Sequence, residues 1–393
     1  MRDLLPFILG LFFIAAIFRV DFFFYILYVF FGVYFLSRVW ADRIVRGIVF
    51  EREFQRRAFL GERVPVRLRL RNRGFLPAPW LRVHERLPIQ LKSPNFYRCV
   101  TSLFPREETT LTYQLDCRRR GYYPIGPLLL TSGDLFGVHT VGKEVPNADA
   151  LIVYPRIVPL SELGLPAQTP FGVLPTRQRL YEDPTRIVGV RGYQSGDSMR
   201  RIHWTATAAT GALQVKRFEP AISIESEIVL NLNRDDYTVH RAETATELGI
   251  VTAASIAHFL IEKQQTVGLS CSGIDPLSET SQPIALPPRK GREQLMHILE
   301  VLARVQAGKG PSFVNLLRRT SLHLTWGGTG IIISAHADDQ LFDSMLLLKR
   351  SGFHLVLILL DPREPFDGIR ERAHLVGIRA YQVWEERDLD VWR

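Results

Sequence analysis

The sequence predicts a multidomain protein with three parts: an N-terminal transmembrane helical hairpin, an all-β sandwich and a C-terminal doubly wound α/β domain. Three observations support this prediction. Two uncharged runs open the chain, short segments of period-two alternation follow, and apolar strands then alternate with helical patterns. With 393 residues, 46% of them hydrophobic and 23% charged, the chain is long enough for two or three domains.

The N-terminal runs extend from Leu4 to Phe18 and from Phe22 to Leu36, and each has 15 residues without a charge. A helix rises about 1.5 Å per residue, so each run covers about 22 Å of a bilayer core of about 30 Å. Flanking residues as far as Trp40 can extend the spans. We therefore predict a transmembrane hairpin over residues 1–40. A signal peptide is the alternative, but the second run and the lack of a small-residue cleavage site disfavour it.

Basic residues predict the orientation of this hairpin. Six arginines follow the second run within residues 38–57, whereas the turn between the runs carries only Arg19, offset by Asp21. The positive-inside rule then places both termini and the soluble domains in the cytoplasm, at the cell inner membrane. The three cysteines are odd in number and form no C-x-x-C pair, which agrees with a reducing compartment.

Residues 41–160 are predicted to form the sandwich. From Val64 to Arg71, apolar residues occupy one face and three arginines the other, which is typical of a half-buried strand. Further strands are expected at Trp80–Arg86, Thr109–Cys117, Pro127–Thr131 and Ala150–Tyr154. Short strands without a convincing helix favour an immunoglobulin-like sandwich. The arginine face is either a solvated surface, which we prefer, or a contact with acidic lipid head groups.

Residues 221–393 alternate between apolar strands and helices, which favours a parallel sheet with helices on both faces. Strands are expected at 222–233, 266–271, 330–334, 353–360 and 377–384. Helices are expected at 243–263, 292–304, 312–319 and 338–349. The prolines concentrated in residues 146–184 suit an extended crossing segment, and we place the boundary between the two domains there.

Residues 161–220 combine this linker with the densest cluster of unusual residues. The cluster reads Arg-Gly-Tyr-Gln-Ser-Gly-Asp-Ser-Met-Arg-Arg-Ile-His-Trp over 191–204, then Leu-Gln-Val-Lys-Arg-Phe-Glu over 213–219. We expect Asp197 to cap a helix that starts at Ser198 and ends at Gly211. The candidate site residues are Arg191, Tyr193, Gly196, Asp197, Arg200, His203, Trp204, Lys216, Phe218 and Glu219.

Two roles are open for this cluster: an internal clamp that joins the domains, or a docking surface for a partner. Arginine and aromatic side chains suit both roles, because they supply forked donors and a large contact area. We prefer the clamp, since apolar Met199 and Ile202 would lie in the same helix. Asp197 and His203 could also serve as acid and base, but a helix cap and a packed histidine explain the same residues.

The cluster resembles the signature of a bacterial domain-of-unknown-function family numbered 58. Arg-Arg-Gly-Tyr-Tyr-Pro-Ile-Gly-Pro over 119–127 and Asp-Leu-Phe-Gly over 134–137 are also similar to that family, as is the predicted architecture. The resemblance implies a von Willebrand factor A-like C-terminal domain and a non-enzymatic adaptor or assembly factor. It also implies two partners, a MoxR-type AAA+ ATPase and a transglutaminase-like membrane protein.

The chain departs from the metal-binding version of that fold, whose first strand ends in Asp-x-Ser-x-Ser. The matching stretch is Asn-Leu-Asn-Arg-Asp, which makes Asn231, Asn233 and Asp235 degenerate metal-site positions. Four carboxylates could still gather at the strand ends: Asp235, Asp236, Asp338 and Asp339. We expect these to be solvated loop residues and predict no metal and no other cofactor.

Enzymatic motifs are missing from the sequence. There is no P-loop, no Gly-x-Ser-x-Gly elbow and no histidine pair at zinc-ligand spacing. We therefore expect a membrane-anchored, non-enzymatic scaffold; the alternative is a metal- or carboxylate-dependent hydrolase acting at the C-terminal edge of the α/β sheet. The net charge of +9 raises nucleic-acid binding as a third class. Anionic lipid accounts for much of that charge, and no nucleic-acid motif is present.

Overall fold

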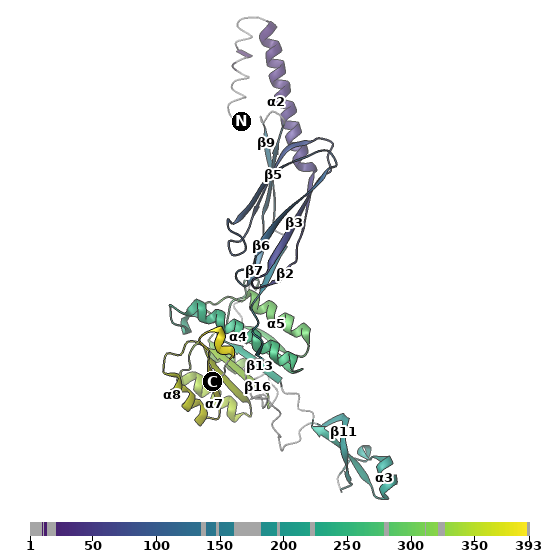
Figure 1. Cartoon of the computed structure of the whole chain (residues 1–393), viewed down its shortest axis with the longest axis vertical. Helices are drawn as coiled ribbons and strands as arrows, with labels where there is room; N and C mark the ends of the chain where they lie inside the picture. The colour runs from purple at the N-terminus through teal and green to yellow at the C-terminus, as the bar shows by residue number, and fades with distance from the viewer. Residues whose placement is uncertain are drawn as a thin grey trace. The chain divides into compact units, whose positions relative to one another are not determined.

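A computed structural model of the chain describes residues 10, 12, 13 and 21–390, without 135–138, 147–148, 161–181, 195–196, 221–224, 279–282, 311 and 321–326. The chain divides into two compact units (Figure 1). The first comprises residues up to Arg156 and the segment Leu299–Val305, and the second comprises Ile157–Ile298 and Gln306–Arg393. The first predicted membrane span, residues 4–18, lies outside the described residues except at positions 10, 12 and 13.

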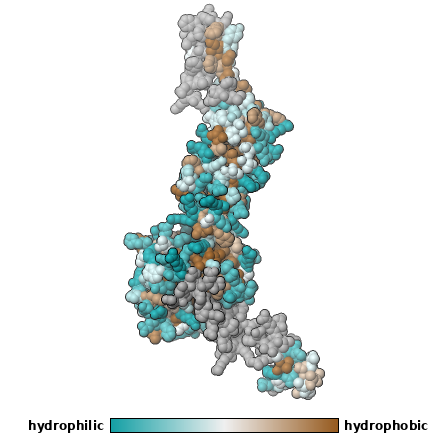
Figure 2. All heavy atoms as spheres, in the orientation of Figure 1, coloured by the Kyte–Doolittle hydropathy of each residue, from teal (hydrophilic) through white to brown (hydrophobic). Residues whose placement is uncertain are grey.

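The second predicted span forms helix α2, Asp21–Gly47. Its stretch Phe24–Gly47 is long and apolar enough to cross a membrane, and only 11% of its most apolar window is buried in protein. Helix α4, Ala242–Glu262, is also long and apolar enough, but 83% of its window is buried, as expected of a core helix. The exposed apolar side chains of α2 are brown in Figure 2.

Beyond Leu36, α2 continues without a break onto the sandwich. One face becomes buried at helical spacing: Ser37, Ala41, Ile44 and Val45. The Ser37 hydroxyl donates a hydrogen bond of 2.8 Å to Asp134 Oδ2. Asp134 Oδ1 in turn accepts one of 2.7 Å from the backbone N–H of His139. The exposed apolar stretch of α2 and the sandwich are therefore joined by a packed continuation of the same helix rather than by a loop.

Ten strands build the sandwich. One antiparallel sheet has the order β1 (Ile48–Glu53), β3 (Arg63–Asn72), β6 (Glu108–Asp116). A second has the order β5 (Phe96–Leu103), β4 (Ala78–Arg86), β8 (Leu128–Gly133), β9 (Thr140–Val145), and a third the order β2 (Arg57–Phe59), β10 (Asp149–Tyr154), β7 (Gly121–Ile125). Apolar residues of β3, β4, β8 and α2 share one core. The predicted strands are confirmed to within two residues, and β1, β2, β5, β7 and β9 were not predicted.

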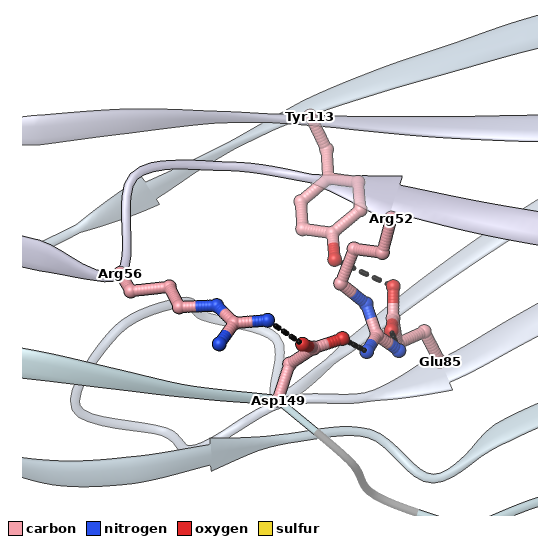
Figure 3. Close-up of polar contacts among 5 residues, drawn as sticks. All are labelled: Arg52, Arg56, Glu85, Tyr113 and Asp149. Carbon is pink, nitrogen blue, oxygen red and sulfur yellow. Dashed lines mark hydrogen bonds and ion pairs between the residues drawn. The ribbon is translucent and has the colours of Figure 1, made fainter.

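A buried polar cluster connects the three sheets (Figure 3). Arg52 of β1 forms ion pairs with Glu85 of β4 and, at 2.8 Å, with Asp149 of β10. The Arg52 and Glu85 side chains are 3% and 0% exposed. The Tyr113 hydroxyl of β6 lies 2.5 Å from Glu85 Oε2 and donates to it. Burial and the charge of Glu85 raise the pKa of Tyr113, so the phenol keeps its proton.

We expect the substitution Glu85→Ala to lower the free energy of unfolding of the first unit by about 3–5 kcal/mol, because it leaves Arg52 buried without its main counter-charge. Arg56→Ala is the matched control, since Arg56 contacts the same cluster through Asp149 but its side chain is 74% exposed. We expect the control to cost less than about 1 kcal/mol. Hydrogen exchange of β1 and β4 in the full chain measures both values. Equal losses for the two variants would contradict the structural role assigned to the buried pair.

The second unit contains a six-stranded sheet in the order β15-β14-β13-β16-β17-β18. The strands are β13 (Glu225–Leu230), β14 (Thr266–Cys271), β15 (Ile284–Arg289), β16 (Thr329–Ser334), β17 (His354–Leu359) and β18 (Arg379–Gln382). Besides α4, the helices around the sheet are α5 (Arg292–Arg304), α6 (Phe313–Thr320), α7 (Asp339–Arg350) and α8 (Phe366–Leu375). Helices α6, α7 and α8 share a core with one face of the sheet. Gly249 of α4 packs against Leu230 and Leu360 on the other face.

Five of these strands pair in parallel, as predicted, but β15 is antiparallel to β14, so the expected all-parallel sheet is wrong in this respect. The edge strand β15 contains Pro287 and Pro288, which obscure its strand pattern and are tolerated because an edge strand pairs on one side only. Helix α8 was also not predicted, since Gly368 and four charged residues interrupt its short apolar pattern.

Candidate functional site

The sequence cluster over 191–219 lies in one small unit, residues 182–220, which we call the motif hairpin. Strands β11 (Glu182–Gly192) and β12 (Gln214–Pro220) pair antiparallel and flank the 3₁₀ turn η2 (Met199–Arg201) and helix α3 (Trp204–Thr210). Ile202 and Val215 pair across the hairpin and are 3% and 1% exposed, which makes them its small core. The local fold therefore rests on these two β-branched residues.

The helix predicted to start at Ser198 is wrong. Met199–Arg201 forms a single 3₁₀ turn, and Ile202 is extended with φ −62° and ψ 131° because it pairs with Val215. Arg200 and His203 therefore do not share a helix face. Met199, which we expected beside Ile202 in that helix, is 63% exposed, whereas Ile202 is buried.

His203, rather than Asp197, caps the helix of the motif. Its Nδ1 accepts a hydrogen bond of 3.1 Å from the backbone N–H of Ala206, and α3 begins at Trp204. Gly211 ends α3 in the left-handed region with φ 66°, as predicted. Because its ring nitrogen holds the first turn of α3, His203 has a structural role in the motif hairpin.

Asp197 pairs instead with Arg191. The guanidinium Nη1 and Nη2 donate to Asp197 Oδ2 and Oδ1, each at 2.7 Å, in a bidentate arrangement. Asp197 Oδ2 also accepts a hydrogen bond of 2.9 Å from the backbone N–H of Gln194. The bonds from Arg191 and then from Gln194 lower the pKa of Asp197. The charged pair thus links Asp197 to the end of β11.

The motif hairpin exposes several large apolar side chains. They are Val190 (44% exposed), Tyr193 (37%), Met199 (63%), Trp204 (66%) and Leu213 (41%). Helix α3 buries none of its side chains. Tryptophan, tyrosine and methionine are enriched in protein interfaces, and exposed ones close together characterise a binding surface.

The structure describes the remaining candidate site residues of the motif only in part. Lys216 is half-buried and stands opposite Val190 in the strand register. Phe218 and Glu219 stand opposite Ile187 and Asp183. Gly196 and the side chains of Arg200, Phe218 and Glu219 lie outside the described residues. The structure therefore brings Arg191, Asp197, His203 and Trp204 into one hairpin.

The two upstream family-like segments have packing roles. The Tyr123 hydroxyl lies 3.0 Å from the carbonyl oxygens of Arg119 and Arg120. A Cβ at Gly121 would lie 2.7 Å from the Tyr123 ring, so the Gly-Tyr-Tyr sequence requires glycine there. Asp134 holds α2 through Ser37, and the rest of its segment, residues 135–137, lies outside the described residues.

The degenerate metal-site positions lie at the carboxyl edge of the α/β sheet. Asn231 Nδ2 donates to Asp236 Oδ2 at 2.8 Å and to Ser334 Oγ at 3.3 Å. Asn231 Oδ1 accepts from the backbone N–H of Asn233 at 3.0 Å and from Ser272 Oγ at 3.2 Å. A divalent cation needs free oxygen lone pairs. Because the amide presents its N–H donors to the neighbouring oxygens, these residues do not fit a divalent cation.

The four carboxylates considered for this edge are not gathered. Asp236 binds Asn231, Asp235 pairs with Lys309 at 3.6 Å, Asp338 caps α7, and Asp339 pairs with Arg372 at 2.7 Å. In the part of the chain that the structure describes, no group of three or more His, Cys, Asp or Glu residues could hold a metal. Sequence reasoning missed Asp361, whose Oδ2 accepts from the N–H and hydroxyl of Thr238. Its place soon after β17 was the available signal.

We expect a chelator, or added Mg²⁺, to leave the melting temperature of the purified chain unchanged. The substitution Asn231→Asp removes the donors to Asp236 and Ser334 and places two carboxylates side by side. It should therefore destabilise the chain by about 1–3 kcal/mol in chelator. Thermal unfolding with and without Mg²⁺ measures both effects. A Mg²⁺-dependent rise in the melting temperature of the natural chain would contradict the closed amide network.

A second polar group lies within the α/β core. Glu227 of β13 is 4% exposed, and its Oε1 accepts a hydrogen bond of 2.7 Å from Ser270. Its Oε2 has no hydrogen-bond partner among the described residues. Opposite it, Gly268 provides the space, because a Cβ there would lie 1.8 Å from Oε2. Burial raises the pKa of Glu227 to about 8. An acid placed directly before the apolar run Ile228–Leu230 was the unused sequence signal.

We expect the substitution Glu227→Gln to remove a pH dependence of stability. The folded-state pKa of about 8 lies above the ordinary value of 4.5. The contribution of Glu227 is therefore fully present below pH 4.5 and is lost as the pH rises towards 8. Above that pH the glutamine variant should be more stable by on the order of a few kcal/mol. Denaturant unfolding across this range measures the difference, and parallel pH profiles for both proteins would refute the assignment.

The strand order and the motif hairpin define a multidomain protein in which a β-sandwich precedes a six-stranded α/β domain. Residues 189–365 match the model of the family described as "Protein of unknown function DUF58", so this part of the chain is similar to that family. It is also 24% identical over 247 residues to the uncharacterized protein YeaD of Bacillus subtilis. That match covers 62% of this chain and 58% of YeaD, so the chain spans little more than half of this relative.

Two kinds of solved structure resemble parts of the chain. A von Willebrand factor type A protein from Catenulispora acidiphila is 9% identical and covers 45% of this chain and 42% of its own, with a TM-score of 0.30. The CARDB domain of a Pyrococcus furiosus protein is 18% identical and covers 27% of this chain and 86% of its own, with a TM-score of 0.20. Because both TM-scores are low, the description of the fold rests on the strand order of this chain and not on these two structures.

Proposed function

We propose that the chain is a membrane-anchored, non-enzymatic adaptor that docks a protein partner through the motif hairpin. The partner we propose is a MoxR-type AAA+ ATPase, with a transglutaminase-like membrane protein as a neighbour, because the family-like sequence cluster implies both. We place the anchor in the cell inner membrane and the soluble domains in the cytoplasm, since arginines follow α2. Helix α2 has the length and apolar surface that this anchor requires.

The bidentate pair between Arg191 and Asp197 is the observation that carries the docking role. Both residues belong to the motif hairpin, so their bond braces the hairpin itself rather than another domain. A braced surface binds a partner at a lower entropic cost than a mobile one. Exposed Trp204 and Met199 supply the apolar anchors that protein interfaces use. These features favour docking over the internal clamp that the sequence suggested.

The hydrolase alternative receives less support. An enzyme at the sheet edge needs a carboxylate cluster or a metal. The four described carboxylates there have other contacts: they bind Asn231, Lys309 and Arg372, or cap the start of α7. Asp197 has its pKa lowered by Arg191, which makes it a poor acid, and His203 uses Nδ1 as a helix cap. We therefore propose no catalytic role for the motif.

We expect Trp204→Ala to reduce the recovery of the MoxR-type ATPase with the tagged full-length chain by about tenfold or more, as loss of an interface anchor does. The ATPase is quantified after capture from solubilised membranes. Leu375→Ala is the matched control, because Leu375 is an exposed apolar residue on α8 at 82% exposure. The melting temperatures of both variants should match that of the natural chain. Undiminished capture of the ATPase by the Trp204 variant would refute docking through this surface.

A further inference from the structure

We propose that the end of the sandwich next to α2 is a second membrane contact, in which Phe75 and Phe104 enter the head-group region of an anionic bilayer. This inference rests on the proposed membrane anchor. The two phenylalanines are 81% and 64% exposed, and both stand in loops between strands. Neighbouring arginines would bind the lipid phosphates.

The two loops form one surface. Residues 73–77 connect β3 to β4, and residues 104–107 connect β5 to β6. The Arg106 guanidinium lies 5.7 Å from the centroid of the Phe75 ring, so the loops touch through a cation–π contact. Ala78 and Leu103, which flank the loops, are paired in the strand register.

Asn72 holds this surface in shape. It is 0% exposed, and its Nδ2 donates to the carbonyl oxygens of Leu76 at 2.8 Å and Leu103 at 3.4 Å. Its Oδ1 accepts from the backbone N–H of Gly74 at 2.9 Å. The backbone of Asn72 also accepts a bond of 2.9 Å from Arg106. Because one buried amide fixes both loops, their phenylalanines are presented to solvent without an ordering cost on binding.

The surface lies at the end of the sandwich that α2 enters. The backbone N–H of Arg73 donates to the carbonyl of Gly47, the last residue of α2, at 2.9 Å. The start of β4 pairs with the end of β8, because Leu81 stands opposite Ser132, and Asp134 follows β8 to bind Ser37. Ser37 comes directly after the exposed apolar stretch of α2. The anchor therefore carries these loops to the bilayer surface.

The excess of arginines around Phe75 and Phe104 favours an anionic bilayer as the binding partner of this surface. Five arginines belong to this part of α2 and to the loops: Arg38, Arg43, Arg46, Arg73 and Arg106. Two carboxylates accompany them, Asp42 and Glu107, and Glu107 accepts the backbone N–H of Phe104. Basic residues beside a membrane helix attract anionic lipid, and phenylalanine is among the apolar side chains that interfacial segments bury at the boundary of head groups and acyl chains. Exposed phenylalanines among arginines match both preferences.

The test uses the full chain in nanodiscs that hold one copy each and contain phosphatidylglycerol. A fluorescent label is placed at Phe75→Cys or Phe104→Cys in a Cys99→Ser background, because Cys117 and Cys271 are buried. Phe59→Cys is the matched control: Phe59 is 43% exposed in β2, near the turn into β3 at the opposite end of the sandwich. Nitroxide-bearing lipids then quench any label that reaches the bilayer.

We expect nitroxide lipid to quench the labels at positions 75 and 104 about twofold or more strongly than the label at position 59. Replacing phosphatidylglycerol by phosphatidylcholine should lower that quenching, and unchanged quenching would refute the role of the arginines. Equal quenching at all three positions, with the chain retained in the nanodisc, overturns the second contact and leaves the anchor intact. A chain that does not assemble with lipid overturns both. Labels shielded from water but not quenched would show a protein cover and overturn the proposal.

Discussion

The first unit depends on a change in the surroundings of α2, whose side chains are largely exposed in its first part and packed against the sandwich in its last part. Up to Leu36 most of the described apolar side chains of the helix are exposed or half-buried, and from Ser37 onward one face is buried against the sandwich. The transition is marked by a buried hydrogen bond from Ser37 to Asp134 and by a short apolar stripe. Because α2 runs on as one helix to Gly47, the apolar stretch and the sandwich are connected without an intervening loop.

Local patterns in the sequence were sufficient for most elements of this fold. Strict alternation over Val64–Arg71 and the long helical pattern of α4 each identify one structure. Strand β5 has Tyr97, Cys99 and Thr101 on its less exposed side, so its alternation carries little apolar contrast. The predicted helix at Ser198 was wrong for a different reason. Asp197 follows a cap rule that depends on its sequence neighbours, but Arg191, six residues earlier, offers a stronger bidentate partner.

Two buried polar side chains, Asn231 and Glu227, form hydrogen bonds between neighbouring strands of the α/β unit. The Asn231 amide ties together the ends of three strands through Ser272, Ser334 and Asp236, and each of its hydrogen-bonding atoms has a partner. Glu227 is less well satisfied and depends on the space that Gly268 leaves. Neither arrangement can be read from residue types alone, since both require knowing which strands are neighbours. The strand order supplies that information.

The lack of buried side chains in helix α3 has a consequence for how its sequence can vary. None of its side chains is buried, and its ends are held by His203 and Gly211. The exposed residues between those caps can therefore be exchanged with little penalty to folding, whereas Thr207 is held, because its Oγ1 accepts a hydrogen bond of 3.0 Å from the backbone N–H of Gln214. Substitutions at the exposed positions of α3 therefore change the outer surface of the motif hairpin and leave its Ile202–Val215 core intact.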